Sequence, residues 1–423
     1  MSLRNCAALL AFSAVAVVAG SGAAVASGYA LREQSGSLLG QAFAGENAYA
    51  ADPSIIFFNP AGMSALDGTR VSVGASFIFP NIEFNNDGST TALGPNILGT
   101  DEGGDIGEKA LAPSVYAMTS FGDFRIGIGV NSPFGLSTEY EDGSIPRFAA
   151  LDSSLRTINV NPVVSYRVAP WLALGVGAQI QRTDARLTNA AFFGAPGEED
   201  VELQADDVGY GFTAGALITP RAGTQIGIGF RSSVSHTLDG DVQINPPVGA
   251  ALKRDASADL DTPESLGVSL SQQVTDRLSL SGTVEWTNWS RFDELRVKFD
   301  SGAPDAVTPE NWNDTYFFSL GGDYKLTDKF TVRGGVAYDQ SPVSDKFRTA
   351  RLPDEDRYWI AIGGTYAVTD AISIDAGYTH IFVKDASINE GFNVTPTGSV
   401  TGTLHGDYDE GIDIFGIQVN IRI

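Results

Sequence analysis

Cysteine is nearly absent from the sequence. Of 423 residues only Cys6 is a cysteine, and it lies in a stretch built like a leader, with an apolar run at 7–19 and the small residues "AVA" at 24–26. We therefore predict that residues 1–26 are a cleaved signal peptide and that Ser27 begins the mature chain. Because Cys6 leaves with the leader and does not lie at the cleavage site, we expect neither a disulfide nor a lipidated N-terminus.

Basic residues are also scarce. Lysine and arginine number 27 against 51 aspartates and glutamates, which gives a formal net charge of -24 at pH 7. Such a chain has few groups with which to neutralise phosphates, so we expect no nucleic-acid partner. The acidity is typical of solvated loops that keep a protein soluble where it meets water.

Long apolar runs are missing after the leader. The segment "SIIFFNPAGM" at 54–63 contains four consecutive apolar residues. That run is too short to cross a membrane as a helix and does not alternate like a half-buried strand. No linker, low-complexity stretch or shift in composition divides the rest of the chain, so we treat it as one structural unit.

The sequence does contain a repeated hairpin. Three stretches have this form: "LSQQVTDRLSLSGTVEW" (270–286), "LGGDYKLTDKFTVRGGVAY" (320–338) and "IGGTYAVTDAISIDAGY" (362–378). In each, two strands surround a tight turn that contains Thr-Asp. Further short turns and long polar connections lead us to expect an all-β chain of about fourteen strands. An even number of antiparallel strands, joined alternately by short turns and long loops, is typical of a bacterial outer-membrane barrel.

The expected strands can be given by range. They are 69–79, 112–120, 124–131, 154–168, 171–187, 207–219, 223–236, 264–273, 277–291, 313–324, 330–340, 357–367, 371–384 and 408–423. The long loops fall near 80–111, 132–153, 188–206, 237–262, 292–312, 341–356 and 385–407. With this order both termini face the periplasm.

The two faces of these strands differ in polarity. In 330–339, one face carries Phe330, Val332, Gly334, Val336 and Tyr338, and the other carries Thr331, Arg333, Gly335, Ala337 and Asp339. The polar face needs water and therefore lines a lumen, while the apolar face meets lipid. Four aromatic residues at strand ends are expected in the interface girdles, namely Trp171, Trp286, Trp359 and Tyr378.

Residues 27–66 are predicted to form a hatch inside the barrel of residues 67–423. Fourteen strands enclose more space than lining side chains can fill. The segment precedes the first expected strand, lacks period-two alternation and carries turn formers such as Asp52-Pro53 and Asn59-Pro60. An ordered periplasmic tail is the alternative.

A second irregularity follows the strand at 124–131. Pro133 cannot donate to a ladder and Gly135 has no side chain to shield the gap, so strand pairing should fail there. A failed ladder in a barrel wall is a candidate side opening. Alternatively, Pro133 simply ends the strand and begins the loop.

Several segments resemble one family in the same order along the chain. They are "SGYALREQSGSLLGQAFAGENA" at the predicted mature N-terminus, "NPA" at 59–61, "FGLSTEY" at 134–140, "WTNWSRFDEL" at 286–295, "AYDQSPV" at 337–343, "LPDEDRYWIAIGGTYAV" at 352–368 and "INEG" at 388–391. Together they span essentially the whole mature chain. The chain resembles the FadL-type outer-membrane transporters of long-chain fatty acids and other hydrophobic compounds.

The resemblance implies a transport route and the residues along it. The hatch motif would be Asn59, Pro60 and Ala61; the N-terminal pocket contacts Ser27, Gly28, Tyr29 and Asp339; and the lateral opening Asn131, Ser132, Pro133 and Gly135. Substrate would pass passively through a pocket beside the N-terminus and leave sideways into the bilayer. The implied partners are hydrophobic small molecules and outer-membrane lipid, and the implied state is a monomer without cofactor or metal.

Two positions depart from the family pattern. Counted without gaps, the basic pocket residue of the fifth strand falls at Leu187, with Arg186 adjacent but of opposite parity, and a second basic residue falls near Thr308. These departures favour uncharged substrates or a rearranged pocket, in which Arg186 is the candidate partner for a carboxylate. The chain also ends in Ile423 rather than the aromatic residue usual in outer-membrane barrels.

Two other functions are open from the sequence. A general hydrophilic porin would suit lumenal charges such as Arg333 and Glu285. An outer-membrane lipid-modifying enzyme would need a catalytic group, but His236, His380 and His405 fall near expected strand ends or loops in no catalytic or metal-binding spacing. We interpret them as surface histidines and expect a transporter rather than an enzyme.

Overall fold

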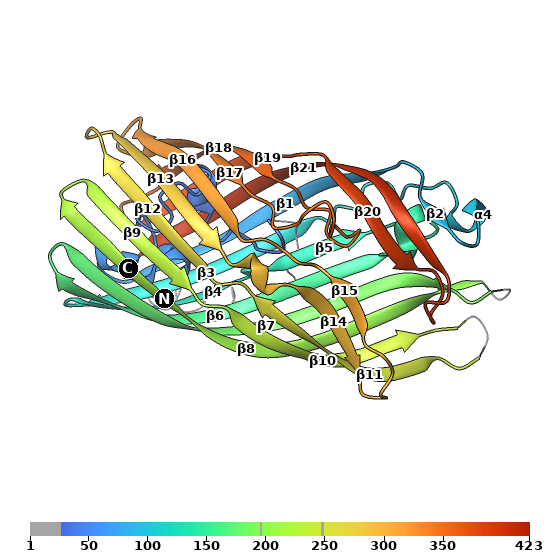
Figure 1. Cartoon of the computed structure of the whole chain (residues 1–423). Helices are drawn as coiled ribbons and strands as arrows, with labels where there is room; N and C mark the ends of the chain where they lie inside the picture. Colours follow the sequence, from blue (N-terminus) through green and yellow to red (C-terminus); the bar gives the residue numbers. More distant parts are fainter. Residues whose placement is uncertain (1–26, 195–196, 247–248) are drawn as a thin grey trace.

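The chain folds into a closed barrel (Figure 1). The computed structural model describes residues 27–194, 197–246 and 249–423, so the predicted signal peptide and Cys6 lie outside the described residues. Among these residues, fourteen antiparallel strands form the barrel wall. The register from Arg70 opposite Arg422 to Asn86 opposite Gly406 joins the last strand to the first. The prediction of a fourteen-stranded antiparallel barrel is confirmed.

The wall strands are as follows. They are β1 (Arg70–Asn86), β3 (Ala110–Phe121), β4 (Phe124–Asn131), β6 (Asp152–Ala169), β7 (Leu172–Phe192), β8 (Glu198–Arg221), β9 (Thr224–Arg231), β12 (Ser265–Gln273), β13 (Leu278–Thr287), β16 (Thr315–Lys325), β17 (Phe330–Asp339), β18 (Arg357–Ala367), β19 (Ile372–Val383) and β21 (Thr401–Arg422). No helix of the described chain is long and apolar enough to cross a membrane.

The long connections contain more regular structure than predicted. They hold β2 (Thr90–Thr91), β5 (Gly135–Glu139), β10 (Val234–Ile244), β11 (Leu252–Thr262), β14 (Glu294–Phe299), β15 (Ala306–Pro309), β20 (Ala386–Asn393) and the short helices α4 (Pro95–Leu98), η3 (Ile145–Phe148) and η4 (Trp289–Arg291). The expected loop at 188–206 is wrong, because β7 and β8 stay paired as far as Phe192 opposite Glu198. The one at 237–262 is wrong in the same way, since β10 pairs with β11. These extensions pass beyond the lipid-facing band, where polar residues are tolerated on both faces of a strand.

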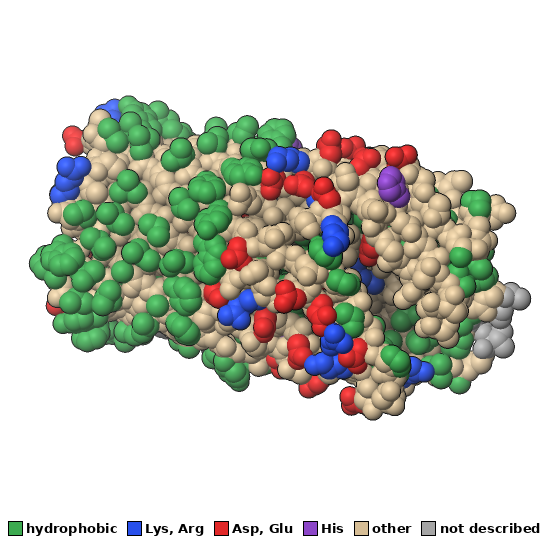
Figure 2. All heavy atoms as spheres, in the orientation of Figure 1, with side chains coloured by type: hydrophobic (Ala, Val, Ile, Leu, Met, Phe, Trp, Pro, Cys, Tyr) green, Lys and Arg blue, Asp and Glu red, His purple; other side chains and the backbone are tan. Residues whose placement is uncertain are grey.

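The predicted inside-out polarity is confirmed. Val336 is 53% exposed on the outer face of β17, whereas Arg333 is 6% and Asp339 5% exposed on its lumenal face. Figure 2 shows apolar side chains spread over one part of the outer surface and charged side chains gathered beyond them. The girdle position expected for Trp359 is wrong. Its alternation with Arg357 turns it into the lumen, where it is buried against Phe43 and Phe317.

Residues 27–66 lie in the lumen and are almost entirely buried. They form α2 (Gly36–Leu39), α3 (Ile55–Phe58) and the 3-10 helix η2 (Pro60–Ala65). The segment is packed so closely against the wall that a Cβ on certain wall glycines would collide with it. The contacts, with the distance from the added Cβ, are Gly377 to Gly40 N (2.9 Å), Gly335 to Gln41 O (2.2 Å), Gly227 to Asn47 O (1.9 Å), Gly175 to Ala61 N (2.5 Å) and Gly127 to Met63 Sδ (2.7 Å).

These contacts show how the segment is laid out. From Gly40 to Met63 they pass from β19 through β17, β9 and β7 to β4, so the chain follows the inner wall round the barrel before it enters β1. The apolar run at 55–58 is the helix α3. All four of its residues are buried in a cluster shared with the wall.

Candidate functional site

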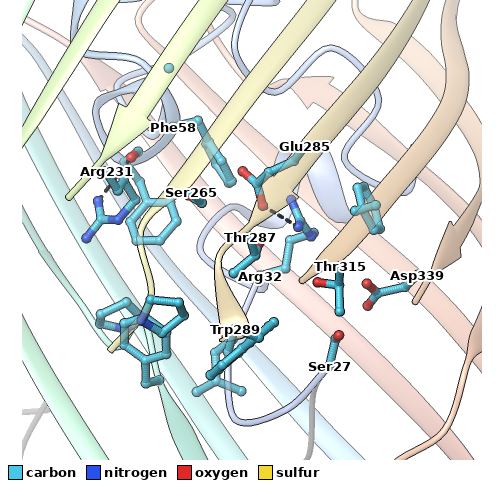
Figure 3. Close-up of a pocket in the computed structure, with 18 of the residues that line it drawn as sticks. Ser27, Arg32, Phe58, Arg231, Ser265, Glu285, Thr287, Trp289, Thr315 and Asp339 are labelled. Carbon is cyan, nitrogen blue, oxygen red and sulfur yellow. Dashed lines mark hydrogen bonds and ion pairs between the residues drawn. The ribbon is translucent and has the colours of Figure 1, made fainter. Parts of the chain in front are cut away.

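A pocket lies between the lumenal segment and the wall (Figure 3). Its lining comes from the N-terminal segment (Ser27, Ala30, Leu31, Arg32), from α3 (Phe57, Phe58), from the end of β4 (Pro133, Phe134) and from seven wall strands and their ends, including Gln179, Arg231, Glu285, Trp289, Phe317, Asp339 and Trp359. Its free volume is about 80 Å³, which is room for a handful of water molecules. The pocket therefore brings together three features that are far apart in sequence.

Tyr29 is held in an aromatic box beside this pocket. The ring centroid of Tyr29 lies 4.7 Å from that of Trp289, 5.5 Å from that of Trp312, and 5.8 Å and 5.9 Å from those of Phe134 and Phe292. These edge and tilted arrangements are favourable for aromatic pairs. These contacts fix the position of Tyr29 and so of the start of the lumenal segment.

Gly28 passes where no larger residue fits. Its φ of +59° lies in the left-handed region, and a Cβ would lie 2.8 Å from Trp289 and 2.9 Å from Trp312. Its backbone N–H donates to the Asp354 carboxylate over 2.8 Å. Burial raises the pKa of Asp354, which lies in the connection before β18.

Two of the predicted N-terminal contacts, Ser27 and Asp339, line the same pocket (Figure 3). The Ser27 hydroxyl donates to the backbone oxygen of Gln340 over 2.7 Å. Arg32 lies on the same side of the pocket and pairs with Glu46 at 2.9 Å and with Glu285 at 2.6 Å. The charges at this end of the pocket are therefore mostly satisfied within the protein.

The predicted hatch motif joins two parts of the lumenal segment to the wall. The Asn59 side-chain amide donates to Asn47 O over 2.7 Å and to Ala216 O on β8 over 2.9 Å. Its oxygen accepts from Ala61 N at 3.0 Å, which caps η2. Pro60 stands at the start of η2, where its missing N–H is not needed.

Two wall glycines receive this motif. A Cβ on Gly215 would lie 2.0 Å from the Asn59 side-chain oxygen, and one on Gly175 would lie 2.5 Å from Ala61 N. Asn59 is completely buried. The motif is therefore a fixed contact between the lumenal segment and strands β7 and β8, one residue after the pocket-lining Phe58.

The strand break at Pro133 interrupts the wall, and the strand then resumes. β4 pairs with β6 as far as Asn131 opposite Asn159, and β5 pairs with β6 again from Gly135 opposite Arg156. The alternative that Pro133 simply ends the strand is wrong. On the other side, the β3–β4 ladder runs only from Val115 opposite Val130 to the turn, and among the described residues the next bridge is Gly107 with Thr138.

Between the pair Val115–Val130 and the pair Gly107–Thr138, no bridge joins residues 108–114 to residues 131–137. We call these two facing stretches the wall gap. The N-terminal segment lies along it. Leu31 N donates to Pro133 O over 2.8 Å, and Ala30 bridges Phe134. Gln34 donates to Ser132 O over 2.7 Å, and Gln34 O accepts from the Tyr116 hydroxyl at 3.0 Å. The lumenal segment thus supplies hydrogen bonds that the neighbouring strand does not make.

Arg186 is not brought to the pocket. Its side chain is 43% exposed, and its guanidinium pairs with Glu202 at 3.0 Å and with Asp152. Leu187 and Thr308, where the family pattern has basic residues, line a different cavity among the long connections. Besides Arg32 of the lumenal segment, the basic residue that lines the pocket is the wall residue Arg231, at the end of β9. Arg231 has the same parity as Gly227 and Gly229, which face the lumenal segment, so strand alternation is the signal that could have found it.

The prediction that all three histidines lie at the surface is only partly correct. His405 is exposed and His380 half-buried, but the assignment is wrong for His236, which is 2% exposed. His236 Nδ1 lies 3.1 Å from Asp207 Oδ2, and its Nε2 lies 3.1 Å from the hydroxyl of the buried Thr183. These contacts tie β10 to β7 and β8. Within the described ranges, no group of three or more His, Cys, Asp or Glu side chains is placed to hold a metal ion.

Comparisons with known proteins cover most of the chain and agree with one another. A family model described as "Outer membrane protein transport protein (OMPP1/FadL/TodX)" matches residues 16–423. A long-chain fatty acid transport protein of Escherichia coli O6:H1 is 30% identical over 89% of each chain. A putative outer membrane protein of Neisseria meningitidis serogroup B is 32% identical over 94% of this chain and 95% of the relative.

Solved structures share the fold. The crystal structure of a Pseudomonas aeruginosa FadL homologue matches with a TM-score of 0.85 and 25% identity, over 93% of this chain and 99% of that one. That of the Ralstonia pickettii toluene transporter TbuX matches the fold with a TM-score of 0.68 at 19% identity, over 93% and 99%. The relatives are outer-membrane and transport proteins, which confirms the expectations of an outer-membrane location and of a transporter rather than an enzyme. The protein belongs to the FadL/TodX family of bacterial outer-membrane transporters of hydrophobic compounds.

Proposed function

We propose that this transporter takes up long-chain fatty acids or other hydrophobic compounds by passive diffusion, with the lumenal segment as the gate and the wall gap as a lateral exit into the bilayer. One observation carries this proposal. A single pocket is lined at once by the N-terminal segment, by α3 of the hatch and by Pro133 at the wall gap. A ligand in that pocket touches both the gate and the exit.

Binding needs no energy input. Each methylene that leaves water for an apolar pocket contributes about 0.8 kcal/mol. The pocket offers Phe57, Phe134 and Trp289 as apolar and aromatic lining. A long acyl or hydrocarbon chain can therefore be extracted from water by burial alone.

The pocket must enlarge to hold such a chain. Its free volume of about 80 Å³ is well below the roughly 300–1,000 Å³ of typical ligand sites. The N-terminal segment and α3 fill the adjacent space, and neither is one of the fourteen wall strands. Displacing these two segments enlarges the pocket and leaves the hydrogen bonds between the wall strands intact. We therefore assign gating to them.

Release through the wall gap keeps the ligand out of water. The gap is covered from inside by residues 29–34, so the displacement that enlarges the pocket also uncovers the exit. A periplasmic exit would instead expose the apolar chain to water. Release by that route would cost about as much free energy as burial of the apolar chain had contributed to binding.

Uptake measurements test both parts of the proposal. Cells that carry the chain should accumulate a labelled long-chain acid or hydrocarbon faster than cells without it. Gly135→Trp should abolish this uptake, because an indole at the edge of the wall gap obstructs it, while the heat-modifiable gel shift of a folded barrel is kept. Unchanged uptake by Gly135→Trp would exclude the lateral route, and equal uptake with and without the chain would exclude the transport function. Steady large conductance of the intact protein would indicate an open porin instead.

A further inference from the structure

Arg231 is a lumenal arginine whose surroundings are neutral. It ends β9 and points into the pocket (Figure 3). Its Nη1 donates to the backbone oxygen of Phe57 over 3.2 Å, and its Nη2 donates to the side-chain oxygen of Gln179. The guanidinium also lies 4.3 Å from the centroid of the Phe57 ring. Every one of these contacts is to an uncharged group.

Arg231 makes no ion pair with any described residue. The pocket carboxylate Glu285 is taken by Arg32 at 2.6 Å. Two other lumenal arginines have acidic partners: Arg333 pairs with Asp375 at 2.9 Å, and Arg357 pairs with Asp354. A charge that is largely removed from water without a counter-ion is costly, so the neutral surroundings of Arg231 call for an explanation.

The partners of Arg231 leave part of the guanidinium fork unused. Gln179 donates its amide hydrogens to Phe212 O at 3.0 Å and to Ser232 O at 3.2 Å, which turns its oxygen towards Arg231. Of the five N–H groups of an arginine, the Nε–H of Arg231 has no hydrogen-bond partner among the described residues. The fork therefore retains donors for a planar anion, which arginine binds in a bidentate manner.

We propose that Arg231 binds the head group of an anionic, carboxylate-bearing substrate and so makes the transporter select a long-chain acid over an uncharged compound of the same length. This inference rests on the proposed function, because it assigns the head-group contact within the same pocket. The tail would then lie along the apolar lining that begins at Phe57 and continues to Phe134 and Trp289. Arg231 would thus be the partner of the substrate carboxylate, the role that the sequence analysis gave to Arg186.

The same contact links the substrate to the gate. A carboxylate on Arg231 competes with Phe57 O, the acceptor that ties α3 to β9. Asn59 follows two residues later and fixes the segment to β8. Binding of an acid therefore loosens α3 at its wall contact, whereas an alcohol that occupies the same apolar lining leaves the contact in place.

The test compares two ligands of equal length on the purified protein in detergent. Dodecanoic acid and dodecan-1-ol are measured by displacement of a labelled ligand at neutral pH. We expect the acid to bind about ten- to a hundredfold more tightly than the alcohol, the range that a charge-assisted hydrogen bond provides. Arg231→Met should remove most of this preference and leave alcohol binding within about threefold, and Arg231→Lys should keep part of it. Arg186→Met, which removes the exposed arginine, is the matched control and should keep the preference.

Hydrogen exchange gives a second readout. The amides at 55–59 should exchange faster with the acid bound than with the alcohol bound, and this difference should vanish in Arg231→Met. Equal affinity of the unmodified protein for acid and alcohol, or an equal loss of both ligands in Arg231→Met, would overturn the assignment of Arg231. If only the assignment of Arg231 is wrong, cells that carry the protein would still take up the alcohol, and the proposed function would stand. Failure of the chain to promote uptake of either ligand would instead overturn the proposed function.

Discussion

The backbone N–H of Gly135 donates a hydrogen bond of 2.8 Å to the carbonyl oxygen of Tyr29. This bond joins the start of the lumenal segment to the residue at which the broken strand resumes. Together with the bond of 2.8 Å from Leu31 N to Pro133 O, it makes the N-terminal segment a short substitute strand along the wall gap. The wall gap and the lumenal segment are therefore one structural feature, although they lie about a hundred residues apart.

A disulfide across this substitute strand should block transport. Ala30 and Phe134 are antiparallel bridge partners, and such partners have Cα separations of about 4.5–5.5 Å, within the range that a disulfide spans. In Ala30→Cys/Phe134→Cys we expect uptake to be lost under oxidising conditions and restored by a reductant. The control is Leu320→Cys/Val336→Cys, an outward-facing register pair of β16 and β17 that does not touch the lumenal segment. Undiminished uptake by the oxidised variant would mean that the segment does not have to leave the wall gap.

Asn59→Ala should free the lumenal segment without opening the barrel. The substitution leaves Asn47 O, Ala216 O and Ala61 N without the side chain they now bond. Each orphaned buried group costs about 1–3 kcal/mol. We expect faster hydrogen exchange at 47–61 and altered uptake, with the gel shift of the folded barrel unchanged. A variant that folds and transports normally would reduce the motif to scaffolding.

Substitutions at two adjacent glycines of β17 can distinguish the packing of the lumenal segment from the stability of the barrel. A Cβ on Gly335 would lie 2.2 Å from Gln41 O, whereas one on Gly334 would have Ala361 O as its nearest atom, at 3.8 Å. Gly335→Ala should therefore displace the lumenal segment, at about 1–3 kcal/mol, the usual range for overpacking. Gly334→Ala should have little effect. Single-channel recordings should show conductance in the first variant and not in the second, and matching traces would show that the packing at Gly335 does not seal the lumen.

Glu310 should make stability depend on pH. It lies between β15 and β16, outside the membrane-spanning strands, and accepts a hydrogen bond of 3.0 Å from Trp312 Nε1. Burial, with a smaller effect of the nearby Glu390, raises the pKa of Glu310 to about 8. Because the folded pKa is above that of an unfolded glutamate, its contribution to stability is complete below about pH 4.5 and is lost as the pH rises through about 8.

Thermal unfolding in detergent between about pH 5 and pH 9 checks this prediction. The melting temperature of the unmodified protein should fall over this range, and Glu310→Gln should fall less, because glutamine keeps an acceptor for Trp312 and never ionises. Glu294→Gln removes an exposed carboxylate of β14 that pairs with Arg296 and serves as the control. If Glu310→Gln and the unmodified protein lose stability in parallel, the buried carboxyl is not the cause.

Much of the barrel could be predicted because its signals are local. Alternation with period two in 330–339 places Arg333 and Asp339 inside and Val336 outside, and the structure agrees. The same rule, applied to Trp359, would have placed it in the lumen rather than in a girdle. The strands beyond the lipid band were missed because they are polar on both faces, as at the neighbouring Asp206 and Asp207 of β8, and an acidic stretch looks like a loop.

The sequence by itself determined the succession of antiparallel strands, their inner and outer faces, the spare segment at 27–66 and the break at Pro133, since each follows from residues next to one another in the chain. Only the tertiary structure decided that the strand resumes at Gly135, that residues 29–34 cover the wall gap, and that Arg231 rather than Arg186 reaches the pocket. Those outcomes depend on strand register and on the course of the lumenal segment round the wall, and both are set by contacts between residues distant in sequence.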